Sequence, residues 1–184
     1  MKNEKYMSSG GLAFTEEKDM KKLSKMAEKG WVLHSFAPLG YKLRKSNPRH
    51  VVYSLDYHDV AKEDLEDYYD IFRAGGWQPV CSEGNMHIFS APPGTKPIYT
   101  DGATRLEKYK RARKLLSKVT LILFAFTALC FLVNFLFIQD YTGLAGVISY
   151  IVQTLAIALF LPSLMTWAAF EVRIRRMASD LKHE

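Results

Sequence analysis

Two long runs without a charged residue lie in the second half of the chain and constrain its fold more than any other feature. The first covers Val119–Ile138 and the second covers Leu144–Phe170, so they are 20 and 27 residues long. A helix of about 20 apolar residues crosses a hydrocarbon core about 30 Å thick. Because a bilayer interior offers no water to backbone amides, such runs cross it as helices. They predict a two-helix transmembrane hairpin closed by a short loop at 139–143, and their length disfavours the buried core of a soluble bundle.

Basic residues flank the two runs but are missing from the loop between them. Seven lie directly before the first run, four follow the second, and the loop at 139–143 holds none. Because Lys and Arg gather in cytoplasmic flanks, this bias predicts a plasma-membrane protein with both termini in the cytoplasm. Met1–Gly11 lacks the apolar segment of a signal peptide, which agrees with that orientation. The seven residues expected to meet the anionic inner leaflet are Arg105, Lys108, Lys110, Arg111, Arg113, Lys114 and Lys118.

The positive charge of the chain is concentrated beside these runs. The net charge is +6, to which residues 1–100 contribute +1 (14 basic, 13 acidic) and residues 101–118 contribute +5 (7 basic, 2 acidic). This distribution favours a lipid bilayer as the anionic partner and argues against a nucleic acid. The acidic run at 63–70 is either a solvated helix face or a docking surface for the basic segment at 104–118.

The N-terminal half repeats one supersecondary unit. Gly30-Trp31 and Gly76-Trp77 are 46 residues apart, and each lies where a predicted helix passes into a predicted hairpin. A period of this size indicates duplication of one unit with the order βαββ. In the first unit we expect a strand near Leu12–Phe14 and a helix over 16–29 with Thr15 as its N-cap. Two such units predict an α+β fold, a ferredoxin-like sandwich with both helices on one face of an antiparallel sheet.

A proline-rich segment after the second unit marks the end of this domain, because proline cannot continue a helix or a central strand. A basic amphipathic helix follows, which either lies along the leaflet or continues straight into the first apolar run. The expected segments are a flexible lead-in at 1–11, a cytoplasmic α+β domain at 12–91, a linker at 92–103, a basic juxtamembrane helix at 104–118, transmembrane helices at 119–138 and 144–170, and a cytoplasmic tail at 171–184.

Several short motifs in the N-terminal half are similar to those of a known family. They are Glu16-Glu17, Leu23, Met26-Ala27-Glu28-Lys29-Gly30-Trp31, Gly40-Tyr41-Lys42-Leu43, Val52-Tyr53-Ser54-Leu55-Asp56-Tyr57 and Gly75-Gly76-Trp77. With them the chain resembles the bacterial domain-of-unknown-function family 2812 over residues 12–110. The resemblance implies an α+β domain followed by membrane helices, and for some members a neighbouring PadR-like transcriptional regulator in Gram-positive bacteria. That family has no established activity, so the resemblance implies no catalytic residue.

Two sets of uncharged side chains are candidates for specific contacts. Asn134 and Gln153 are polar residues inside the two apolar runs, and we expect them to form a contact between the spans. Aromatic residues of the N-terminal domain either pack in its core or line a groove for a partner. The groove candidates are Trp31, Tyr41 and Trp77.

Nothing in the residue pattern indicates catalysis. Cys81 and Cys130 belong to different environments, fit a reducing compartment and show no zinc or redox spacing. No pair of titratable residues suggests acid and base roles, so we expect no enzyme activity, no metal and no cofactor. The first hypothesis is a membrane-anchored regulatory or interaction module that binds an unidentified protein, or itself as a homodimer. The alternative is a small membrane subunit of an envelope-stress, immunity or transport system that acts through its hairpin.

Overall fold

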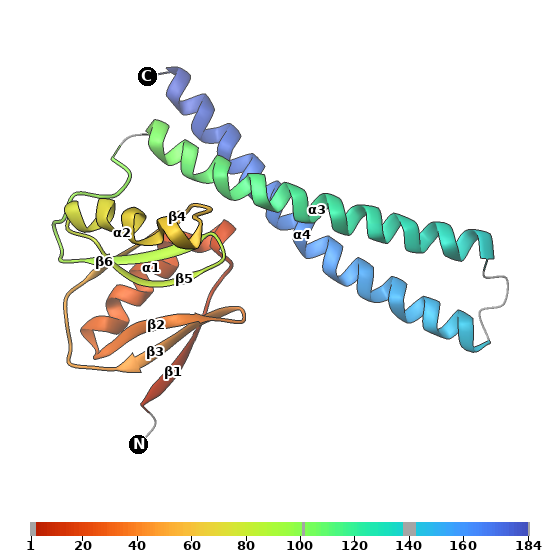
Figure 1. Ribbon diagram of the computed structural model, residues 1–184, viewed down its shortest axis with the longest axis horizontal. Helices are drawn as coiled ribbons and strands as arrows, with labels where there is room; N and C mark the ends of the chain where they lie inside the picture. Colours follow the sequence, from red (N-terminus) through yellow and green to blue (C-terminus); the bar gives the residue numbers. More distant parts are fainter. Residues whose placement is uncertain (1–2, 101, 138–142, 184) are drawn as a thin grey trace.

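The computed structural model describes residues 3–100, 102–137 and 143–183. Residues 3–100 form a compact α+β part, here called the head, from which two long helices project side by side as a helical hairpin (Figure 1). The elements are β1 (Glu4–Ser8), α1 (Leu12–Glu28), β2 (Trp31–Ala37), β3 (Gly40–Lys45), β4 (Val52–Tyr57), η1 (Lys62–Asp64), α2 (Leu65–Ala74), β5 (Gln78–Glu83), β6 (Met86–Ala91), α3 (Gly102–Phe137) and α4 (Leu144–His183).

The head contains two βαββ units with the same topology. The strands pair antiparallel in the orders β1-β3-β2 and β4-β6-β5, so the third strand of each unit is central. The single ferredoxin-like sheet is not confirmed, because the strands form two three-stranded sheets. β2 and β5 lie beside one another, but each carries a register shift, and Pro79 in β5 lacks the N–H that a shared ladder would need.

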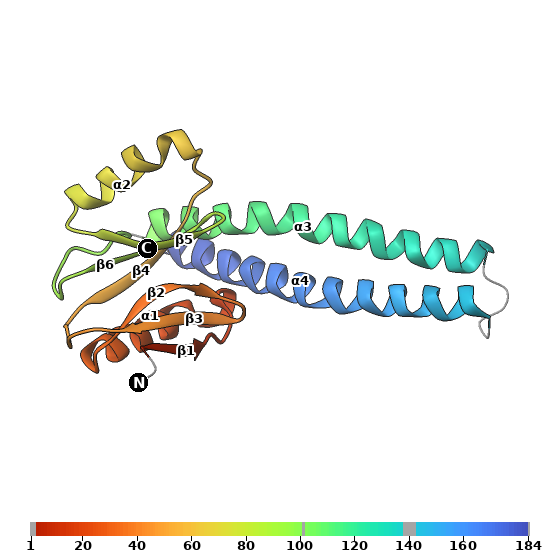
Figure 2. The same cartoon turned by 60° about the horizontal axis from the view of Figure 1, so that its bottom comes forward.

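The two head helices lie on opposite faces of the β4-β6-β5 sheet, whereas both were expected on one face (Figure 2). Side chains alternate along a strand, so neighbours in β6 point to opposite faces. Ile88 packs in the main core with Leu23 of α1, and Phe89 packs in a second cluster with Phe72 of α2. The main core also takes Leu43 from β3, so α1 is enclosed between the two sheets.

Within the lead-in expected at 1–11, the described residues include a strand. Glu4–Ser8 forms β1, and Leu12–Phe14, expected as a strand, is the first turn of α1. Thr15 departs from helical geometry with φ −127°, so the regular helix begins at Glu16, close to the expected start. β1 pairs so closely with β3 that a Cβ at Gly40 would meet the Met7 carbonyl oxygen. That contact explains why glycine begins the Gly40-Tyr41 motif.

Of the two courses expected for the basic segment at 104–118, the structure shows the one in which it continues straight into the first apolar run. α3 joins the basic segment at 104–118 to the first apolar run without a break, and α4 extends through the expected tail to His183. Both helices are long and apolar enough to cross a membrane, and only 17% and 11% of their most apolar windows are buried. The end of the first run at residue 138 and the loop at 139–142 lie outside the described residues.

Candidate functional site

The head and the hairpin share one hydrophobic core. Tyr109 and Ala112 of α3 and Phe170 and Ile174 of α4 are buried among residues from α1 and from both sheets. The Tyr57 ring from β4 meets the Phe170 ring edge-on, with 6.0 Å between centroids. Burial of this kind stabilises by about 25 cal/mol per Å² of apolar surface. The base of the hairpin is therefore a structural part of the head, and the junction between them is the candidate site.

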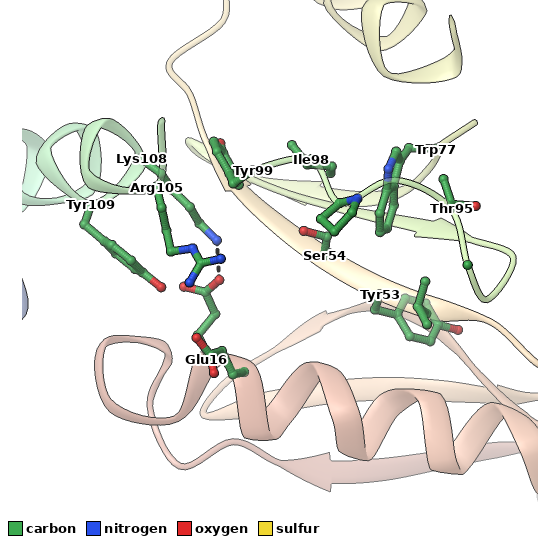
Figure 3. Close-up of a pocket in the computed structure, with 14 residues that line it drawn as sticks. Glu16, Tyr53, Ser54, Trp77, Thr95, Ile98, Tyr99, Arg105, Lys108 and Tyr109 are labelled. Carbon is green, nitrogen blue, oxygen red and sulfur yellow. Dashed lines mark hydrogen bonds and ion pairs between the residues drawn. The ribbon is translucent and has the colours of Figure 1, made fainter. Parts of the chain in front are cut away.

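A buried ion pair crosses this junction. The Lys108 ammonium of α3 bonds to the Glu16 carboxylate of α1, and each residue is only 4% exposed (Figure 3). The same ammonium lies 5.2 Å from the centroid of the Tyr99 ring and 5.7 Å from that of Tyr57. Removing charges from water is costly unless they are paired and hydrogen-bonded, so this pair requires the two elements to stay together.

Asp56 at the end of β4 is the centre of a second network. Its carboxylate accepts bonds from the Tyr68 hydroxyl at 2.7 Å and from the Tyr99 hydroxyl, and it lies 3.4 Å from the Arg111 guanidinium of α3. Burial, and next to it the Asp56 charge, raises the pKa of Tyr68 and of Tyr99 well above the usual range. Both phenols therefore stay neutral donors, and the carboxylate links α2, the linker before α3, and α3 itself.

A third set of contacts ties α4 to the same place. Glu171 accepts bonds from Arg113 of α3 at 2.5 Å and from Arg175 at 2.7 Å. The Arg173 guanidinium lies 4.4 Å from the centroid of the Tyr109 ring and 3.4 Å from the Ala13 carbonyl oxygen. Each of the three elements α1, α3 and α4 thus carries a charged contact to another at the junction.

The structure divides the seven basic residues that were expected to meet lipid. Lys108, Arg111 and Arg113 face the head or α4, because acids distant in sequence supply their partners. Lys110 bonds to Glu107 at 2.7 Å on the exposed side of α3. The remaining three, Arg105, Lys114 and Lys118, are exposed.

The acidic run at 63–70 does not supply those partners. Glu66 and Asp70 instead accept bonds from Arg73 on α2, at 3.0 Å and 2.6 Å. Glu16 and Asp56, which the sequence did not single out as site residues, take the role that was considered for this run. Glu16 follows Thr15 and looks like an ordinary first-turn acid, so local pattern holds no signal for its long-range pairing.

A cavity of about 330 Å³ opens beside the Lys108–Glu16 pair (Figure 3). Figure 3 shows Glu16, Arg105 and Lys108 on one side and Ser54, Trp77 and Ile98 on the other. Both charge signs line it, and among the residues that the structure describes no group of three or more His, Cys, Asp or Glu is placed to hold a metal. Its lining combines the charged side chains of the junction with apolar and aromatic ones.

The aromatic groove candidates do not share one surface. Tyr41 is 1% exposed in the main core, and Trp77 is 5% exposed in the second cluster, where its indole donates to the Lys96 carbonyl at 3.0 Å. Trp31 is partly buried with the Lys5 ammonium 5.7 Å from its ring centroid. Their separation favours packing as the role of these three side chains.

Polar side chains join the apolar parts of α3 and α4. Asn134 donates to the Gln153 side-chain oxygen at 2.8 Å, and the Ser149 hydroxyl donates to Asn134 at 2.7 Å. Thr120 and Ser163 lie 2.7 Å apart at the other end. The Asn134–Gln153 contact is the one that the sequence suggested, while hydroxyl pairs of this kind have no distinctive spacing.

Comparison with known proteins identifies the family of the chain. The profile of the family described as "Protein of unknown function (DUF2812)" matches residues 15–122, which include most of the head and the junction part of α3. Neither curated proteins nor solved structures gave a significant match. Since the matched segment is more than half of the 184 residues, the chain belongs to the DUF2812 family.

Proposed function

We propose that this protein is a membrane-anchored, non-enzymatic regulatory or interaction module, whose head binds a cytoplasmic protein partner and is held rigidly to a transmembrane hairpin. The observation that carries the proposal is the junction. A head that was merely tethered would need no shared core and no buried ion pair with the hairpin. A flexible linker would be enough to confine such a domain to a membrane.

The membrane placement rests on the two helices and on charge. Their most apolar windows are mostly exposed, with hydrophobic side chains such as Leu121, Phe135 and Leu159 open to the surroundings. A soluble protein would leave this large apolar surface in water, which is unfavourable. With Lys114 and Lys118 beside the first run, the charge bias favours a head on the cytoplasmic side of the plasma membrane.

The acidic side chains at the junction are occupied by contacts within the chain, which supports a binding role. The carboxylates of Glu16 and Asp56 are both engaged by cations and donors within the chain. Burial raises the pKa of the Cys81 thiol to about 12, so it is a poor nucleophile at neutral pH. The contacts among the described residues thus fix the shape of the head relative to the hairpin. A surface of fixed shape is suited to the recognition of a partner.

Crosslinking in cells tests the proposal on the full chain. A photo-crosslinking residue replaces Ile71 on α2 or Lys42 on β3, both exposed on the head, and in a matched variant it replaces Leu159, exposed on α4. We expect a defined protein adduct, or a dimer of the chain, from the head positions and lipid adducts from Leu159. Protein adducts at Leu159 alone would favour the alternative, in which the hairpin engages another membrane protein. Adducts at neither site would contradict the proposal.

A further inference from the structure

One end of the head points along the hairpin. In Figures 1 and 2 the turn between β2 and β3 and the turn between β5 and β6 both extend in the direction in which α3 and α4 leave the head. Two large apolar side chains are open to the surroundings at this end, Leu39 in the first turn (88% exposed) and Phe14 at the start of α1 (55% exposed). The Leu39 carbonyl bonds to the Ser9 amide at 2.9 Å, so the turn is joined to the segment before α1.

Leu39 is an unusual residue for its place. Its φ of 57° lies in the left-handed region, and Gly40 is the next residue of the turn. Glycine or asparagine adopts this conformation more easily, and a branched hydrophobic side chain there is uncommon. Leucine is not favoured by this backbone conformation, and its exposed side chain adds little packing to the head. Its presence here indicates a contact with something outside the head.

The surface beside Leu39 is hollow and mainly apolar. A groove of about 400 Å³ runs past the turn, and Leu12, Phe36 and Met86 contribute to its walls. Glu83 is the acidic residue that lines it. Apolar contact, more than attraction between opposite charges, is therefore what this end of the head offers to a partner.

The position of Phe14 relative to α4 indicates which partner this is. The carbonyl of its neighbour Ala13 lies 3.4 Å from the Arg173 guanidinium, and Ala13 shares the main core with Phe170. The uncharged run of α4 ends at Phe170, and Glu171 and Arg173 follow. If this run spans a bilayer, the residues that follow it lie at the level of the head groups, where amphipathic and aromatic side chains concentrate. Phe14 then lies at the same level.

We infer that this end of the head is a second, peripheral membrane contact, in which Leu39 and Phe14 insert among the lipid head groups of the leaflet that the hairpin enters. The inference depends on the membrane placement proposed above. It adds a lipid-facing surface on the α+β domain, distinct from the spans and from the basic residues of α3. Because Glu83 lines the groove and apolar side chains make the contact, the insertion should not require anionic lipid.

Spin labels on the full chain in nanodiscs test it. The background carries Cys81→Ala and Cys130→Ala, and single cysteines are introduced as Phe14→Cys, Leu39→Cys, Ile71→Cys or Leu159→Cys. Ile71, 72% exposed on α2, is the matched control on the far face of the β4-β6-β5 sheet, and Leu159, 62% exposed on α4, reports the span. The readouts are collision rates of the nitroxide with oxygen, which favours lipid, and with a water-soluble nickel chelate.

The expected result is a higher oxygen-to-nickel ratio at Phe14→Cys and Leu39→Cys than at Ile71→Cys, in phosphatidylcholine discs and equally in discs with phosphatidylglycerol. Ratios equal to that of Ile71→Cys, with a lipid-like ratio at Leu159→Cys, would overturn the inference and leave the membrane placement intact. A water-like ratio at Leu159→Cys would overturn both. Protection that appears only in discs holding two copies, with a short distance between labels at Leu39→Cys, would assign the surface to self-association instead.

Discussion

At the scale of single residues, the Lys108–Glu16 pair is the contact on which the junction depends most. Each side chain is about as buried as a core leucine, and the Glu16 Oε2 atom has no hydrogen-bond partner among the residues that the structure describes. The pair is therefore buried, and its hydrogen bonding is incomplete. In such a site, losing one partner is far worse than losing both, because the survivor is left charged and unpaired.

Lys108→Met should destabilise the head strongly. A broken buried pair costs about 3–5 kcal/mol, and the remaining Glu16 carboxylate would have no cation in contact. The measurement is the midpoint of thermal unfolding of the purified chain in detergent micelles, followed by near-ultraviolet circular dichroism. The double variant Lys108→Met with Glu16→Leu is the control, and it should recover much of the loss. Equal midpoints for the single variant and the wild type would refute a structural role for this pair.

Tyr57→Phe should stabilise the protein. The Tyr57 hydroxyl is buried without a partner among the described residues, and an unsatisfied buried polar group costs about 1–3 kcal/mol. We expect a gain of about 1 kcal/mol, visible as a higher unfolding midpoint. Tyr41→Phe is the matched control, because its hydroxyl donates to Asp19 at 3.4 Å and its removal should lower the midpoint.

Tyr57 and other buried tyrosines predict a loss of stability in alkali. Burial, followed by the nearby Glu16 charge, raises the pKa of Tyr57 well above 10, and burial also raises the pKa of Tyr53 and Tyr68. A folded-state pKa above that of the unfolded chain gives stability that is complete below about pH 10 and declines as pH rises beyond it. The midpoint of thermal unfolding should fall as the pH is raised above about 10, and this fall should be shallower in Tyr57→Phe. A slope that the substitution does not change would contradict the assignment to this residue.

At the scale of elements, the pairing of α3 with α4 has a polar component that can be removed by itself. Asn134 connects Gln153 and Ser149 of α4 to α3. Asn134→Leu replaces the amide with an apolar side chain of similar volume. Both partners then lose their hydrogen bond to this position. Polar contacts between spans contribute roughly 1 kcal/mol, so the hairpin should unfold at a lower dodecyl sulfate fraction. Phe135→Leu, whose side chain is 85% exposed, is the neighbouring control and should have no effect.

Most elements could be predicted because their patterns are local. The duplicated Gly-Trp junctions and the alternating strands indicate β2, β3, β5 and β6, and the uncharged runs indicate the hairpin. β1 was missed because only one of its five residues, Met7, is partly buried, so it lacks the alternation of a half-covered strand. The two-sheet arrangement could not be predicted either, since it depends on Pro79 and on bulges at the edges where β2 and β5 meet.

The contacts of the junction were beyond prediction for a different reason. Lys108 and Glu16 are 92 residues apart, and Arg111 and Asp56 are 55 residues apart. From the sequence, each basic residue of α3 fits a lipid-facing role equally well, because composition gives the charge of a helix but not the direction of each side chain. Asn134 and Gln153 were easier, since few polar residues occur within the apolar runs.

At the scale of the whole molecule, the shared core implies that the head does not fold alone. A fragment of residues 1–100 would lose Tyr109, Ala112, Phe170 and Ile174 from the main core and leave Glu16 without Lys108. We expect it to lack cooperative thermal unfolding and to give poorly dispersed amide resonances. The control joins residues 1–118 to residues 168–183 through a flexible Gly/Ser linker, which restores those partners without the apolar runs, and it should fold. A cooperative transition in the 1–100 fragment would show that the hairpin base is dispensable.

The unbroken course of α3 from the junction into the apolar run has a mechanical consequence. A helix of 36 residues is about 54 Å long at 1.5 Å per residue. Because the helix is continuous over Gly102–Phe137, a turn of the head by about 10° would carry the far end sideways by about 9 Å over that length. If the hairpin spans a bilayer as proposed above, α3 would act as a lever arm that turns a small rotation of the head into a larger displacement at the far end of the hairpin.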